Sequence, residues 1–166
     1  MSEAKVGPEF VKHEFDEAIA IQQCIVEAES SLARTHPVAS AKRTLKSALA
    51  ADEKYLQQLR TLGQEHDATG EVEDVAGGLV ELMTSTLEKA TSEGNDSDYY
   101  EAHAVLLNLK RKQWDSAGGM LAIARDQKDT TLRDAAKDFQ AGQKETSTAL
   151  TKELAAYAVR IAGQAA

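Results

Sequence analysis

The chain has 166 residues, of which 42% are hydrophobic and 5% aromatic, and its 27 acidic and 19 basic side chains give a formal net charge of −8. This length fits one domain that buries most of its apolar surface on folding. The negative charge opposes a phosphate backbone, so no nucleic-acid partner is expected. No apolar run approaches the ~20 residues of a membrane span, and residues 1–7 lack the apolar core of a signal peptide, so we expect a cytoplasmic protein without a membrane contact.

The composition favours helices throughout. Ala, Leu, Glu, Lys and Gln are abundant, proline occurs only at positions 8 and 37, and alternating runs of Val, Ile and Thr are absent. We therefore predict a flexible N-terminus over residues 1–7 and a single helical domain over residues 8–163.

Five helices are predicted in chain order from apolar residues at helical spacing and from the breaks between them. The first runs over residues 8–34 and ends at Thr35-His36-Pro37, and the second runs over 37–62 and ends at Gly63. A shorter helix covers 71–93, a third long helix runs from about 98 to 125, and the last lies between Asp129 and Gly163. Short linkers make neighbouring long helices antiparallel, and the shorter helix is the natural crossover between the second and third. The expected fold is an all-α antiparallel four-helix bundle.

Three segments carry a resemblance to a known family. They are Ala51-Asp52-Glu53-Lys54-Tyr55-Leu56-Gln57-Gln58-Leu59, Gly78-Leu79-Val80-Glu81-Leu82 and Tyr100-Glu101-Ala102-His103-Ala104. Together with the layout, they are similar to the ferritin-like superfamily, and most of all to the YciF-like stress-response proteins. The resemblance implies a ferritin-like bundle, a role in stress and, in the metal-bearing members, a centre of iron or manganese.

The ligand pattern of such a centre is incomplete in this sequence. Ferritin-like sites take one Glu from each of two helices and a Glu-x-x-His pair from each of the others. The residues three positions before the four histidines are Phe10, Ala33, Gly63 and Tyr100, so none completes the pair. Where the family carries acids or His near mid-helix, this chain has Gln22 or Gln23, Ala48 and Gln143. A neutral amide cannot supply the charge that a hard di-cation needs, so we expect a degenerate or absent metal centre and no cofactor.

Asp52 is the sharpest candidate for a special role, because it lies on an apolar stripe formed by Leu45, Leu49, Leu56 and Leu59. Two interpretations remain open. Asp52 could ligate a metal, or it could be satisfied by a charge pair with Lys110 or by hydrogen bonds to Gln143, Thr146 or Tyr55. Counting residues back from the turn at His36 places Glu17 level with Asp52 as its partner carboxylate, with Glu27 as second choice.

Three further residues complete the candidate metal set of Glu17, Asp52, Glu101, His103 and Glu145. Glu101 matches the family's third-helix acid, but it also stands three residues after Asp98, which is the spacing of a capping box. His103 falls on an apolar stripe and could bind a metal or be a hydrogen-bonded core histidine. Glu145 is the mid-helix acid of the last helix and lies beside its core stripe.

The leading functional hypothesis is a stress-associated helical bundle with a degenerate metal centre, a structural or interaction role and no enzymatic activity. The alternative is a di-iron or di-manganese oxidative-stress protein with ferroxidase or peroxidase chemistry. A third hypothesis is an adaptor that presents a groove to a partner helix. We also predict a homodimer, because four apolar residues of the crossover helix recur at helical spacing and need a cover: Leu79, Leu82, Met83 and Leu87.

Overall fold

The computed structural model describes residues 5–164, which form five helices and no strands. The helices are α1 (Pro8–Thr35), α2 (Ala39–Gln64), α3 (Asp74–Glu93), α4 (Asp96–Asp126) and α5 (Thr130–Ala162). The predicted all-α fold and the predicted order of long and short helices are confirmed. Residues 1–4 of the predicted flexible N-terminus lie outside the described residues. Within the described part of the chain, no helix combines the length and the apolar character that crossing a membrane requires.

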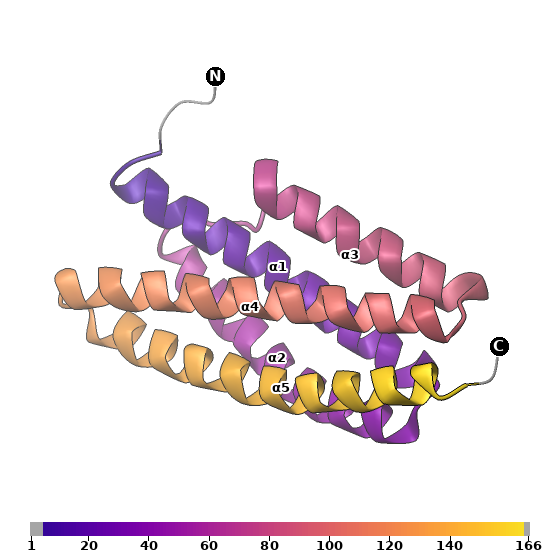
Figure 1. Cartoon of the computed structure of the whole chain (residues 1–166). Helices are drawn as coiled ribbons and strands as arrows, with labels where there is room; N and C mark the ends of the chain where they lie inside the picture. The colour runs from indigo at the N-terminus through magenta and orange to yellow at the C-terminus, as the bar shows by residue number, and fades with distance from the viewer. Residues whose placement is uncertain (1–4, 165–166) are drawn as a thin grey trace.

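Two helical hairpins form the bundle, one made of α1 and α2 and the other of α4 and α5 (Figure 1). The hairpins contact each other through α1 with α4 and through α2 with α5. Helix α3 carries the chain from the end of α2 to the start of α4 and packs on α1 and α4 alone. The predicted crossover helix is therefore present, and it covers one side of the bundle.

Local signals explain where the helices begin. Pro8 occupies the first turn of α1, where its missing N–H costs nothing. The Asn95 side chain accepts hydrogen bonds from the backbone N–H of Ser97 and Asp98 at 2.9 and 3.2 Å, and Asp98 Oδ2 accepts from the Asn95 N–H at 3.1 Å. The capping box of α4 is thus formed by Asn95 and Asp98, and the predicted box of Asp98 with Glu101 is wrong. The helix begins at Asp96, earlier than predicted, because the Asn95 side chain caps the N–H groups of its first turn.

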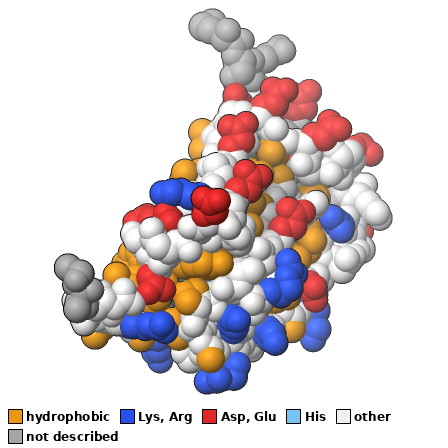
Figure 2. All heavy atoms as spheres, turned by 90° about the vertical axis from the view of Figure 1, so that its right-hand side faces the viewer, with side chains coloured by type: hydrophobic (Ala, Val, Ile, Leu, Met, Phe, Trp, Pro, Cys, Tyr) orange, Lys and Arg blue, Asp and Glu red, His pale blue; other side chains and the backbone are white. Residues whose placement is uncertain are grey.

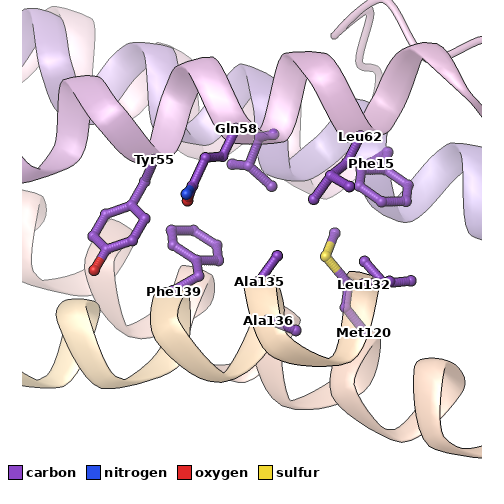
Figure 3. Close-up of a pocket in the computed structure, with 10 residues that line it drawn as sticks. Phe15, Tyr55, Gln58, Leu62, Met120, Leu132, Ala135, Ala136 and Phe139 are labelled. Atoms are coloured by element: carbon purple, nitrogen blue, oxygen red, sulfur yellow. The ribbon is translucent and has the colours of Figure 1, made fainter. Parts of the chain in front are cut away.

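Apolar side chains form two core clusters along the bundle. One contains Ile21, Ile25, Leu32, Leu45, Met83, Leu106 and Leu150, and the other contains Phe15, Ile19, Leu56, Leu59, Met120, Leu132 and Phe139. The second cluster leaves a gap between α2 and α5, lined among others by Phe15, Tyr55, Met120 and Phe139 (Figure 3). Its cavity volume of about 10 Å³ is that of one water at most, so it holds no ligand.

The inner face of α3 belongs to the core of its own chain. Met83 is 1% exposed, and Leu79 and Leu87 pack partly buried against the first core cluster. Leu82 is 49% exposed. Met83 is therefore not available for the predicted dimer contact, because the bundle itself covers it, whereas the homodimer remains a prediction.

Charge is unevenly distributed over the surface. Figure 2 shows acidic side chains gathered in the upper part of one end of the molecule and lysines and arginines in the lower part. The segment 65–98, which contains α3, has ten acidic residues, and Lys89 is its single lysine or arginine. The face around α3 is therefore strongly acidic.

Candidate functional site: a buried lysine between two carboxylates

Three ionisable side chains meet in the interior between the two core clusters. Lys110 of α4, Asp52 of α2 and Glu29 of α1 are each 0% exposed. Lys110 Nζ donates to Asp52 Oδ2 at 2.5 Å and to Glu29 Oε1 at 3.1 Å. One ammonium group therefore joins three helices of the bundle, and we call these three residues the central triad.

The helical register explains why these polar residues lie inside. Asp52 stands between the buried Ala48 and Leu56 of α2, and Lys110 follows the buried Leu106 by four residues in α4. Residues four apart share one face of a helix, so the core face carries both groups inward. The predicted charge pair of Asp52 with Lys110 is confirmed.

Two glutamine side chains complete the surroundings of Asp52. Gln22 Nε2 donates to Asp52 Oδ1 at 2.8 Å, and Gln143 Nε2 donates to the same oxygen at 2.5 Å. The predicted hydrogen bond from Gln143 is therefore confirmed. The other two predicted partners bond elsewhere, since Tyr55 donates to the carbonyl of Asp138 and Thr146 to that of Gly142.

A third glutamine extends the network. Gln113 Nε2 donates to Gln22 Oε1 and to the Ala18 carbonyl, both at 2.9 Å. Three acceptor oxygens at the centre have no partner among the described residues: Glu29 Oε2, Gln113 Oε1 and Gln143 Oε1. The network therefore has more acceptor atoms than donors to satisfy them.

Burial raises the pKa of Glu29 well above its usual range, and the neighbouring charge of Asp52 raises it further, whereas Lys110 acts in the opposite direction. A charge without a counter-charge is costly in a dry interior. With Glu29 protonated, the ammonium of Lys110 and the carboxylate of Asp52 balance each other and the triad is neutral.

Sequence analysis missed Glu29 and misplaced the partner of Asp52. Gln22 of α1 contacts Asp52, whereas Glu17 was predicted to do so, and these two positions are five residues apart, which is more than one helical turn. Counting from a turn ignores how the two helices cross and rotate. A signal for Glu29 was present, because it stands four residues from both Ile25 and Ala33, which are buried on the same face.

The other candidate ligands do not join the central triad. Glu17 is bound at its Oε2 by Lys112 at 2.9 Å and lies 3.4 Å from His13 Nε2. Together with His13 and Glu14 it forms the one group of three possible metal ligands found in residues 5–164, all on α1. Glu101 and Glu145 are exposed on α4 and α5. The structure thus brings no two of the five predicted ligands together.

His103 is a hydrogen-bonded core residue. It is 0% exposed, and its Nε2 donates to the Leu150 carbonyl at 2.9 Å. A second buried histidine, His36, stands with its ring centroid 5.6 Å away, and its Nδ1 accepts from the Val38 N–H at 3.1 Å. Burial lowers the pKa of His103 and, with the adjacent His103 ring, lowers that of His36 to about 4. Both rings are therefore neutral at neutral pH.

Because of these two buried histidines, we predict that the folded protein loses stability in acid. Because their pKa values are lower in the folded chain than the ordinary value of about 6.5, the unfolded chain binds more protons, and stability is lost as the pH falls from about 6.5 towards 4. Protonating His36 also removes the acceptor of the Val38 N–H at the start of α2. We expect a loss of roughly 2 kcal/mol from His36 between pH 7 and pH 5. Urea unfolding measures it, and a His36→Gln variant whose stability falls equally would contradict it.

Comparison of the sequence with protein-family models and with curated proteins gives no match. Comparison of the structure shows that the chain is similar to the stress protein YciF of E. coli, with a TM-score of 0.73 and 15% sequence identity. The match covers 92% of this chain and 97% of the YciF chain. The expected resemblance to the YciF fold is therefore confirmed, and the chain has the same helical-bundle architecture.

Proposed function

We propose that this protein is a stress-associated helical bundle that works without a metal, through its structure and self-association, with Lys110 as the cation of its central site. The observation that carries the proposal is the position of Lys110 Nζ, which lies within hydrogen-bonding distance of both Asp52 and Glu29. In a ferritin-like centre, a metal ion would join carboxylates from different helices in this way. Here an ammonium group of the chain makes that connection.

The surroundings of Asp52 also argue against a bound metal. Both glutamine side chains that contact Asp52 Oδ1 present N–H groups, and the other oxygen faces an ammonium group. A metal ligand must offer a lone pair to the ion, and donors and cations around it oppose the charge of the ion. The di-iron or di-manganese alternative would require these partners to withdraw and the exposed Glu101 and Glu145 to turn inward.

The association with stress is supported by the shared fold with a protein described as a stress protein. A structural role is also supported by the central triad, because its charged side chains pair with each other and need no bound ion. Self-association has candidate contacts in the exposed Leu82 and Val75 of α3. Since the α3 face is acidic, two copies meeting there would repel each other, so a dimer through α3 would strengthen with added salt.

Elemental analysis tests the proposal. Protein purified without chelators from cells supplied with iron and manganese should hold well below one transition metal per chain. With iron added, it should not consume peroxide faster than the same amount of iron without protein. Lys110→Ala is the matched control, because it removes the ammonium and leaves both carboxylates. Metal found only in this variant would show that the lysine excludes it. Two stoichiometric metals in the unaltered protein would overturn the proposal.

A further inference from the structure

The central triad places an amine against a carboxyl group in a dry setting. Lys110 Nζ lies 2.5 Å from Asp52 Oδ2, and both side chains are 0% exposed. In water these groups persist as ions, because hydration stabilises both charges. In an apolar interior ions lose that hydration, which narrows the free-energy difference between an ion pair and the neutral pair of amine and acid. The short contact is the path for that proton.

The hydrogen bonds around the Asp52 carboxyl group suit attack by a nucleophile on its carbon atom. Its Oδ1 receives two N–H groups, from Gln22 at 2.8 Å and from Gln143 at 2.5 Å. When a nucleophile adds to a carbonyl carbon, negative charge develops on this oxygen, and preorganised donors stabilise it. The remaining oxygen, Oδ2, faces Lys110 and can leave.

Glu29 supplies the proton carrier that such a reaction needs. Its Oε1 lies 3.1 Å from Lys110 Nζ, and its Oε2 has no hydrogen-bond partner among the residues the structure describes. Burial raises the pKa of this carboxyl group, which favours its protonated, proton-donating form. It can therefore accept a proton from nitrogen at Oε1 and give up the proton that it already holds.

From this geometry we infer that Lys110 and Asp52 join in an intramolecular amide bond, with Glu29 as the residue that moves the protons. The neutral amine nitrogen adds to Cγ of Asp52, and the charge on Oδ1 is held by the two glutamine N–H groups. Glu29 accepts the proton from nitrogen and returns a proton to the Oδ2 hydroxyl, which leaves as water. One C–N bond forms, one C–O bond breaks, no electron is gained or lost, and Glu29 ends protonated as it began.

The fold provides the driving force. Groups held in place within one molecule react as if at an effective concentration of about 10⁵–10⁸ M, and this gain favours an amide that would hydrolyse between separate molecules in water. The product is neutral and keeps the glutamine hydrogen bonds. It joins α2 to α4 across the bundle and closes a loop that contains α3, since residues 52 and 110 are 58 positions apart. The bond goes beyond the proposed function: Lys110 is the cation of the centre before the bond forms, and the neutral amide connects α2 and α4 in its place afterwards, so no metal is needed in either state.

Intact mass spectrometry of the unfolded full chain tests the bond. After incubation of the folded protein at growth temperature, we expect a mass lower than that of the sequence by one water, with allowance for removal of Met1. A cyclised aspartate also loses water, so protease digestion must yield a peptide in which the segments containing Asp52 and Lys110 are linked. A lowered mass without that linked peptide would overturn the inference.

Two variants complete the test. Lys110→Arg keeps the charge but removes the nucleophilic amine, and Glu29→Gln keeps the shape but removes the proton carrier, so both should retain the full mass. Circular dichroism shows whether Lys110→Arg folds. If it does not, the mass of the Glu29→Gln variant tests the bond alone. A folded, unaltered protein with full mass after prolonged incubation would overturn the bond and leave the proposed function intact. A bound metal would instead overturn the proposed function.

Discussion

Replacement of Lys110 by alanine is expected to lower the free energy of unfolding by roughly 3 kcal/mol. The change leaves Asp52 buried at 0% exposure without its cation, and Glu29 loses its partner as well. An unpaired charge in the interior costs far more than the removal of a charge pair as a whole. Urea unfolding at neutral pH measures the loss.

Lys112→Ala is the matched control. Lys112 lies two residues away and pairs with Glu17 at 2.9 Å, but its side chain is 30% exposed. Water can replace such a partner, so a loss of about 1 kcal/mol or less is expected. Adding Asp52→Asn to Lys110→Ala should recover part of the stability, because it removes the unpaired charge. A loss within ~0.5 kcal/mol for Lys110→Ala would contradict the buried triad.

Met83→Glu is expected to destabilise the protein by more than about 3 kcal/mol, whereas Leu82→Glu should change stability by less than ~1 kcal/mol. The two residues are neighbours on α3, but Met83 is 1% exposed and Leu82 is 49% exposed. A charge at position 83 would enter the core between α3 and the hairpins, so α3 should detach. Chemical unfolding followed by circular dichroism compares the two variants, and equal effects would show that α3 does not pack as described.

The same pair of variants examines self-association. If α3 provides the dimer contact, Leu82→Glu should shift sedimentation equilibrium towards the monomer without unfolding the bundle. An unchanged mass distribution in an associating protein would place the contact elsewhere.

The helices could be predicted because their signals are local. Pro8, Pro37, Gly63 and the segment around Gly94 interrupt the apolar spacing, and the observed helices begin or end near them. The position of Asp52 on an apolar stripe was enough to predict a buried partner on another helix. Lys110 and Gln143 were found because each lies on the inward stripe of its own helix.

Contacts between helices could not be predicted in the same way. Whether Gln22 or Glu17 reaches Asp52 depends on the crossing and rotation of α1 against α2, and these follow from side-chain packing. The apolar stripe of α3 predicts that Met83 is buried. It does not predict whether Met83 packs against a second copy of the chain or against the bundle of its own chain. Glu29 escaped notice because an acidic residue on a long helix is ordinarily exposed.

Anomalous diffraction at the bundle centre tests the central claim most directly. Crystals grown with manganese and measured near its absorption edge report any ion between Glu29 and Asp52. We predict no anomalous peak there and nitrogen density from Lys110 in contact with Asp52, as an ammonium group or as an amide. An anomalous peak at that position, with the Lys110 side chain displaced from both carboxylates, would contradict the account.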